Sequence, residues 1–222
     1  MSTTDARRRG AGPRPAGLFV NFEGGDGCGK TTQMHILARR LAAEGRDVLE
    51  TTEPGGTRIG TMIRRILLDS ANQELCPTAE LLLYFASRAQ NVEEVIIPAL
   101  KQGKIVLSDR FTDSTMAYQG FGRGLGEQIV VDLDRIACRG LAPDLTILID
   151  IDLETSLARA KQRNLDLIES RMDAQAVEFH QKVRDAYLEL ARREPVRFRV
   201  IDGRGAIDTV ACAVWKAVEQ YV

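Results

Sequence analysis

The segment FEGGDGCGKTT, residues 22–32, constrains the fold more than any other part of the chain. It contains the pattern GxxxxGK[ST] at residues 24–31, between an apolar run and a segment of helical apolar spacing. Glycines recur in such a loop because backbone amides can turn inward around phosphate oxygens only where side chains are absent. A turn that binds nothing fits this context poorly, so the segment predicts a nucleotide phosphate-binding loop.

Five nearly continuous apolar runs alternate with longer segments of helical period. The runs are LFVNFE (18–23), DVLETT (47–52), KIVLSD (104–109), LTILID (145–150) and RFRVID (197–202). Uninterrupted runs are typical of parallel strands covered on both faces, and apolar stripes indicate helices at residues 34–41, 179–190 and 207–218. We therefore expect an α/β fold of P-loop kinase type, with a doubly wound five-stranded parallel sheet. Ligands of such sheets bind beyond the carboxyl ends of the strands, where Glu23, Glu53, Asp109 and Asp150 stand.

The first 17 residues differ from the rest of the chain. They carry Arg7, Arg8, Arg9 and Arg14 against Asp5, with too little apolar surface to fold. We expect a disordered tail at 1–17 and one domain at 18–222. A nucleic-acid-binding arm is a less favoured interpretation, so no nucleic-acid partner is predicted.

Location and redox state follow from what the sequence lacks. No apolar core of secretory type follows the basic start, and no run is long enough to span a bilayer, so no membrane partner is expected. Cys28, Cys76, Cys138 and Cys212 are far apart and form no CxxC pair. This spacing favours neither disulfides nor zinc and fits a reducing cytoplasm.

The loop itself supplies the candidate ATP ligands. Lys30 is expected to reach the β and γ phosphates, and the Thr31 hydroxyl to bind Mg²⁺. The predicted ATP-binding set is Gly24, Gly25, Asp26, Gly27, Cys28, Gly29, Lys30, Thr31 and Thr32. Neither the NKxD motif of GTPases nor the LSGGQ motif of transporter ATPases occurs, so the nucleotide loop belongs to another class.

Acids and arginines farther along the chain suggest a second substrate. SDRF (108–111) ends the third strand with Asp109, positioned to hold Mg²⁺ through water, and Arg110, able to bind phosphate bidentately. A structural ion pair between these two residues is the alternative. Arg88, beside an apolar helix face in YFASRAQ, either snorkels to solvent or contacts a ligand.

These motifs together resemble the bacterial thymidylate kinases. FEGGDGCGKTT, EPGGT, LYFASRAQ, SDRFTDSTMAYQGFGRG and APDLTILID follow one another in the family's order from residue 18 to the last helix, and DSTMAYQG is the most specific of them. The resemblance implies transfer of the γ-phosphoryl group of ATP to dTMP with Mg²⁺, in dTTP biosynthesis. Another P-loop nucleotide or nucleoside kinase, or a non-catalytic nucleotide switch, stays open as an alternative.

The resemblance also implies roles for individual residues. Arg110 would bind the dTMP phosphate, Arg88 a thymine carbonyl and Thr115 the ring nitrogen, while Tyr118 would disfavour a ribose. Asp26 would contact the sugar hydroxyl or a Mg²⁺-bound water. The full dTMP set implied is Asp26, Glu53, Tyr84, Arg88, Arg110, Thr115, Tyr118 and Gln119, with Thr31 and Asp109 for the metal.

The transition-state cations would come from a lid at about 159–171, because the loop position that carries arginine in some family members is Gly27 here. Arg159, Lys161 and Arg163 lie in that lid, and the predicted catalytic set is Lys30, Arg110, Arg159 and Arg163. A solvated basic face is the alternative.

Two positions depart from the family, and one property rests on the family alone. Thr52 replaces a common arginine, and Tyr84 replaces the stacking phenylalanine, which preserves stacking but adds a hydroxyl. The family also implies a homodimer, for which apolar helices at 80–100 and 127–137 could supply a face.

Overall fold

The computed structural model describes residues 16–164 and 175–222. Its centre is an all-parallel five-stranded sheet with the order β2-β3-β1-β4-β5. The strands are β1 (Leu18–Glu23), β2 (Val48–Thr52), β3 (Ile105–Asp109), β4 (Leu145–Asp150) and β5 (Phe198–Asp202). All five coincide with the predicted runs, apart from a one-residue delay at the start of β2, β3 and β5. The predicted doubly wound sheet is confirmed.

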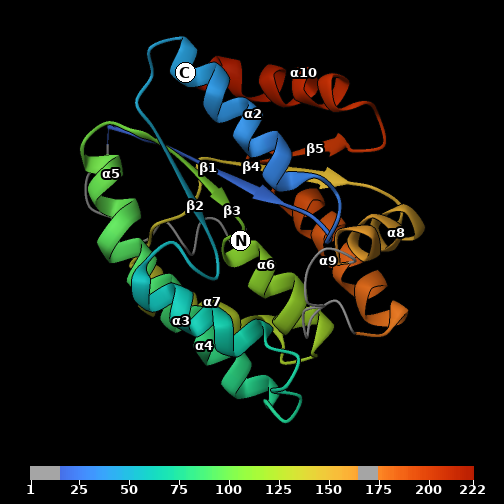
Figure 1. Ribbon diagram of the computed structural model, residues 1–222. Coiled ribbons are helices and arrows are strands. Elements are labelled where there is room, and N and C mark those ends of the chain that lie inside the picture. The colour runs from blue at the N-terminus through green and yellow to red at the C-terminus, as the bar shows by residue number, and fades with distance from the viewer. Residues whose placement is uncertain (1–15, 165–174) are drawn as a thin grey trace.

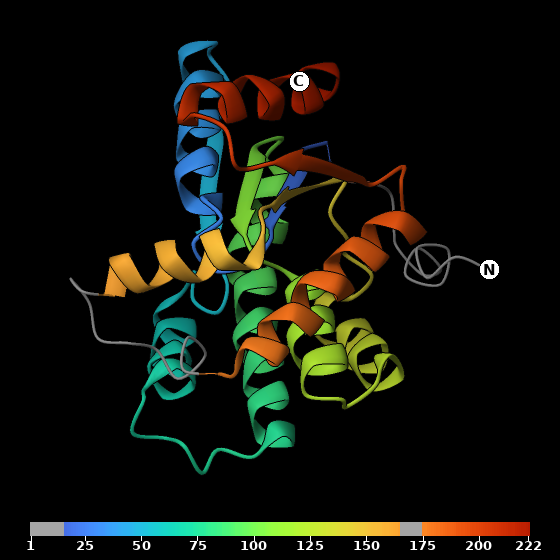
Figure 2. The same ribbon diagram turned by 90° about the vertical axis from the view of Figure 1, so that its right-hand side faces the viewer.

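Helices connect the strands and cover both faces (Figures 1 and 2). They are α2 (Lys30–Ala43), α3 (Arg58–Leu68), α4 (Pro77–Asn91), α5 (Ile97–Lys101), α6 (Thr112–Thr115), α7 (Glu127–Cys138), α8 (Leu153–Asn164), α9 (Val177–Arg193) and α10 (Ile207–Val218). Two π-helical segments, η1 (Val92–Ile96) and η2 (Met116–Gly122), continue α4 and α6, and the 3₁₀ turn η3 (Glu219–Tyr221) ends the chain. None of the described helices has the length and apolar character needed to cross a bilayer.

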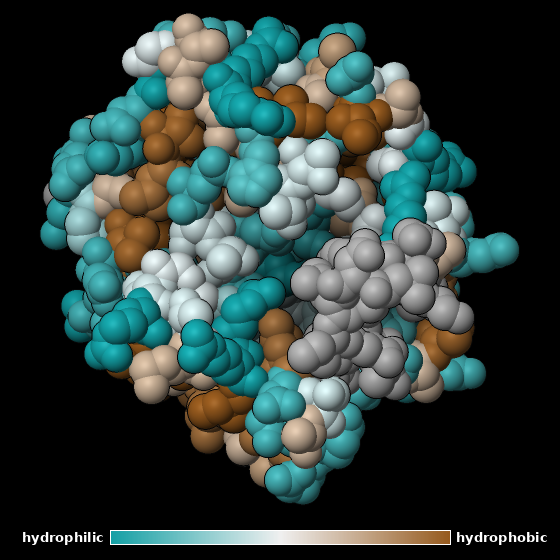
Figure 3. Space-filling view, in the orientation of Figure 1, coloured by the Kyte–Doolittle hydropathy of each residue, from teal (hydrophilic) through white to brown (hydrophobic). Residues whose placement is uncertain are grey.

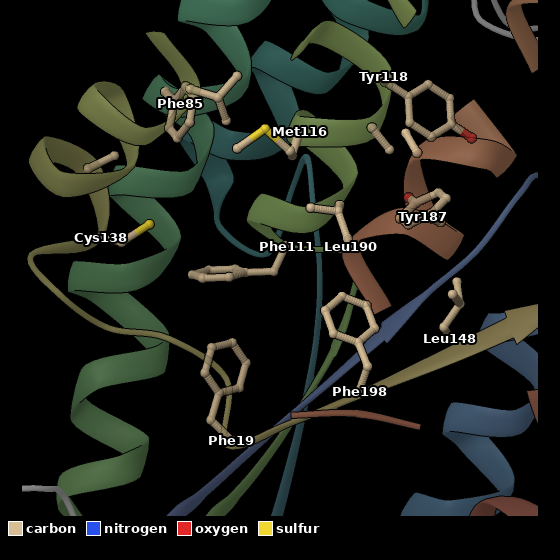
Figure 4. Close-up of a cluster of buried hydrophobic side chains, with 14 of the residues drawn as sticks. Phe19, Phe85, Phe111, Met116, Tyr118, Cys138, Leu148, Tyr187, Leu190 and Phe198 are labelled. Carbon is tan, nitrogen blue, oxygen red and sulfur yellow. The ribbon is translucent and has the colours of Figure 1, made fainter. Parts of the chain in front are cut away.

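Each face of the sheet has its own apolar core. On one side α2 and α10 pack on residues such as Val20 and Ile147, and on the other α4, α7 and α9 surround Phe19 and Phe198 (Figure 4). Side chains of a strand alternate between faces, so Phe19 and Val20 enter different cores. The predicted stripes of α2 and α9 are buried, whereas Ile207 at the start of α10 is exposed.

Strand register brings the polar strand ends together. β1 lies between β3 and β4, and Phe22 pairs with Asp109, so Glu23 and Asp109 reach the same edge. Residues 1–15 of the predicted tail lie outside the described residues. Gly17 belongs to the fold, because its N–H donates to Leu100 O at 3.0 Å.

Candidate active site

The phosphate loop links β1 to α2 in a conformation that requires glycine. Gly24 has φ 138°, and a Cβ there would lie 2.3 Å from Ile149 O, while Gly29 caps α2 at φ 96°. Lys30 begins α2, is buried, and donates from Nζ to Gly25 O at 2.9 Å. The lysine therefore curls back over the loop, beside the positive end of the helix.

Cys28 and Thr32 contribute differently to this loop. The Cys28 thiol is buried 3.8 Å from Lys30 Nζ, and burial raises its pKa. It is thus a small packed group with little thiolate character. Thr32 is exposed on α2.

The two residues predicted to hold a metal are in contact. Thr31 Oγ1 donates a hydrogen bond to Asp109 Oδ2, because the ends of β1 and β3 are neighbours. A hydroxyl and a carboxylate beside a phosphate loop fit Mg²⁺, which uses few protein oxygens and retains waters. No group of three or more His, Cys, Asp or Glu suited to a metal occurs among the described residues.

Arg110 lies at the junction between the phosphate loop and the helices that follow β3. Its backbone has φ 72°, unusual for a residue with a side chain, and is held by hydrogen bonds from Arg110 N to Phe22 O and from Ser108 Oγ to Arg110 O. Its Nη2 donates to Asp26 Oδ1 at 2.7 Å and Tyr118 OH at 3.3 Å. Tyr118 OH in turn donates to Asp26 Oδ2 at 2.9 Å.

These contacts identify the ion-pair partner of Arg110. Its ion pair is with Asp26 of the loop rather than with its neighbour Asp109. Burial acts to lower the pKa of Arg110, but nearby oxygen atoms, led by those of Tyr118 and Asp26, raise it well above its usual value. The side chain is therefore a permanent cation, partly open to solvent.

Arg88 forms a second polar centre, on α4. It is buried, donates from Nε to Glu53 Oε2 at 2.6 Å and from Nη2 to Thr115 Oγ1 at 3.0 Å, and therefore does not snorkel. Glu53 is also held by Asn91 Nδ2 at 3.1 Å, and burial raises the Glu53 pKa. Arg88 Nη1 is buried without a hydrogen-bond partner among the described residues. An orphan donor of this kind calls for an oxygen or nitrogen acceptor from a ligand.

Arg64 on α3 is a candidate that the sequence analysis missed. It is half-buried and donates from Nη1 to Pro54 O at 2.8 Å. Burial lowers its pKa, and Tyr84, Arg110, Asp109 and Asp26 lie close enough to perturb it further. Arg64 therefore lies near Arg110 and the phosphate loop. The sequence offers Arg64 and Arg65 side by side, and only packing distinguishes them.

The remaining predicted residues lie on α4, η2 and α8. Tyr84 is half-buried on α4, and Gln119 is buried with its Nε2 donating to Glu80 Oε1 at 2.8 Å. Arg159 is exposed on α8 and donates to Gly203 O at 3.3 Å.

The predicted lid is described only in part. Residues 159–164 continue α8, whereas the side chains of Lys161 and Arg163 and all of residues 165–171 lie outside the described residues. Figure 3 shows a hydrophilic recess where β1 and β3 end and α6 begins in Figure 1.

Comparison with known proteins gives a consistent result. A model of the family described as thymidylate kinase matches residues 22–214. A thymidylate kinase of Pelobacter propionicus is 51% identical over 207 residues, covering 92% of this chain and 94% of that protein. One from Caldanaerobacter subterraneus is 48% identical over 206 residues, covering 93% and 97%.

A solved structure agrees with these relatives. The crystal structure of thymidylate kinase from Ehrlichia chaffeensis superposes with a TM-score of 0.76 at 34% identity, covering 92% of this chain and all of that one. The similarity thus extends over nearly the whole domain, and the family match at residues 22–214 spans the segments quoted above.

Proposed function

This chain belongs to the thymidylate kinase family, and from that premise we propose how its residues carry out ATP-dependent phosphorylation of dTMP to dTDP. The donor ATP binds at the phosphate loop. Loop amides and Lys30 hold the β and γ phosphates, and Thr31 and Asp109 would hold Mg²⁺. That ion, when bound, neutralises phosphate charge. Arg159 and Arg163 from α8 supply further cations.

The acceptor dTMP binds between α4 and η2. Arg88 Nη1 is proposed to donate to a thymine carbonyl, and Thr115 and Gln119 to contact the base edge. Tyr84 supplies an aromatic surface on α4. Tyr118 and Asp26 contact the sugar edge. Because the Tyr118 hydroxyl already donates to Asp26, we favour the sugar role for Asp26 over the Mg²⁺-bound water.

The dTMP phosphate is held by arginines from two elements. Arg110 follows β3 and Arg64 lies on α3, and Asp26 acts to raise the pKa of both. No side chain needs to act as a general base, because the phosphate is already an anion that can attack the γ phosphorus. Catalysis then consists of aligning the two phosphates and neutralising their charge.

One observation carries this proposal: the Arg110 guanidinium donates both to Gly24 O and Asp26 of the phosphate loop and to Tyr118 of the acceptor side. A cation shared by both sides is what in-line transfer between two polyanions requires. A non-catalytic switch would have no use for it.

ADP release measured with dTMP, dUMP, dCMP and thymidine tests the activity. Purified protein with Mg²⁺ and ATP should prefer dTMP, and Arg110→Ala should lower kcat/KM for dTMP by about a hundredfold while ATP affinity is unchanged. Equal rates with all acceptors would favour another nucleotide kinase. Unaltered turnover in Arg110→Ala would contradict the assigned role.

We also propose a homodimer in the cytoplasm. Exposed apolar side chains lie on three neighbouring helices. They are Ile59, Met62 and Ile66 on α3, Leu82 on α4, and Ile129 and Ile136 on α7. The predicted face at 80–100 and 127–137 is thereby enlarged by α3. All four cysteines are free thiols, which fits a reducing compartment.

A further inference from the structure

The two terminal nitrogens of Arg110 have different surroundings. Nη2 contacts Asp26 and Tyr118, both on the side of the proposed substrates. Nη1 donates to Gly24 O at 3.2 Å, Ser114 Oγ at 3.0 Å and Tyr187 OH at 3.1 Å. With two hydrogens and three acceptors, Nη1 is fully engaged by the protein.

A buried carboxylate orients the two hydroxyls that hold Nη1. Glu23 Oε2 accepts hydrogen bonds from Ser114 Oγ at 2.5 Å and Tyr187 OH at 2.8 Å, and the two hydroxyl oxygens are 2.8 Å apart. A carboxylate is the strongest acceptor within reach, so it draws the hydroxyl protons and leaves their lone pairs facing Arg110. The charge of Glu23 is in this way transmitted to Arg110 without direct contact.

Glu23 is itself fully supported. Its Oε1 accepts from Asn21 Nδ2 and Phe111 N, each at 2.9 Å, and from Ser114 N at 3.1 Å. Burial and then Asp113 raise the Glu23 pKa, while Arg110 and the side-chain hydrogen bonds from Ser114 and Asn21 oppose them. The carboxylate thus has a fixed position behind the hydroxyls.

Tyr187 links this cluster to α9, a helix distant in sequence from the loop and from β3. Its ring is buried in the core, edge-on to Tyr118 with centroids 6.3 Å apart (Figure 4). The same helix is fixed to the end of β4 by Arg184, which donates to both oxygens of Asp150 at 2.8 Å. Tyr187 is therefore a rigid support.

We propose that Tyr187 is a positioning residue for phosphoryl transfer, acting through Arg110. Held at Nη1 by Tyr187, Ser114 and Gly24, the guanidinium keeps its direction when Nη2 exchanges Asp26 for the acceptor phosphate. Pre-organisation of this kind removes the entropy cost of fixing a long side chain when the substrate binds. The inference rests on the proposed function of Arg110 as the acceptor-phosphate cation.

Tyr187→Phe tests this, because it removes only the hydroxyl. Affinities for dTMP and for thymidine, which lacks the phosphate, are measured by calorimetry alongside thermal unfolding. We expect dTMP to bind about tenfold more weakly, as for one hydrogen bond to a charged group, and thymidine to bind as in the wild type. Tyr221→Phe is the matched control, since Tyr221 OH accepts from Arg199 Nη2 at 3.4 Å away from the site. It should change neither affinity.

Two further variants make the outcome decisive. Ser114→Ala removes the other hydroxyl and should also weaken the binding of dTMP but not of thymidine. This variant tests the same contact if Tyr187→Phe does not fold. Equal loss of dTMP and thymidine affinity in both variants, or no loss in either, would overturn the inference. Arg110→Ala separates the two levels of the argument: if it leaves the dTMP-to-thymidine ratio unaltered, the role of Arg110 fails. If Arg110→Ala abolishes the preference for dTMP over thymidine while Tyr187→Phe keeps it, only the positioning role of Tyr187 fails.

Discussion

Arg88 shows how a single residue can restrict the acceptor. Its charge is balanced by Glu53 inside the protein, and Nη2 donates to Thr115, whereas Nη1 has no partner among the described residues and can donate to a ligand. A buried donor without a partner costs about 1–3 kcal/mol until it is satisfied. In the free enzyme this free-energy cost remains, and a bound base with a correctly placed acceptor atom removes it. Such a site discriminates well between similar bases.

Arg88→Lys should separate recognition from folding. Lysine keeps the positive charge beside Glu53 but loses the forked donor geometry, so the KM for dTMP should rise about tenfold or more while the KM for ATP is unchanged. Steady-state kinetics with both substrates measure this. Arg197→Lys is the control: Arg197 is equally buried, paired with Asp113 and Glu194, and its change should lower thermal stability without altering the preference for dTMP. A similar shift in both variants would argue that Arg88 is structural.

At the scale of elements, the segments that follow β1, β2 and β3 each contribute one part of the site. The first residue of α2 is Lys30, and the segment after β3 supplies Arg110. α3 begins at a Thr57 cap, whose Oγ1 accepts from Gly60 N at 2.9 Å, and carries Arg64 two turns later. Helix caps fix where a helix begins and hence which of its residues face the site.

Arg64→Ala tests whether α3 contributes a phosphate contact. Loss of a half-buried cation near the acceptor should raise the KM for dTMP about tenfold and leave thymidine binding unaltered. The neighbouring Arg65 is exposed, so Arg65→Ala, which removes the same charge from the same helix, should have no such effect. Identical behaviour of the two variants would show that only the net charge of α3 matters.

For the molecule as a whole, the sequence predicted the features that short continuous stretches of residues specify, namely the strands and the phosphate loop. The strands agree within one residue because parallel strands covered on both faces leave continuous apolar runs, and the loop residues follow from one motif. Arg64 and Tyr187 were missed for a physical reason. Helical spacing indicates that Tyr187 is buried, as it is, but not that its hydroxyl reaches Arg110 from 77 positions away. Such contacts arise only when the sheet brings separate segments together.

The exposed apolar side chains of the neighbouring helices α3, α4 and α7 bear on assembly. Met62 and Leu82 are each about half exposed and Ile136 is 74% exposed, and solvent-facing apolar side chains grouped on adjacent helices indicate an interface. A charge placed there would be buried without a partner in a dimer, so Met62→Glu should convert a dimer into a monomer.

Light scattering coupled to size-exclusion chromatography measures the mass directly. Val196→Glu is the control, because Val196 is 83% exposed but precedes β5 at the opposite edge of the sheet from β2, which α3 follows. It should leave the dimer intact. A wild-type protein that is monomeric at every concentration, or a Met62→Glu variant that stays dimeric, would show that this face has another role.

Since α3 also carries Arg64, a dimer formed through α3 would fix the helix that contacts the acceptor phosphate. Dilution to monomer should then raise the KM for dTMP more than the KM for ATP.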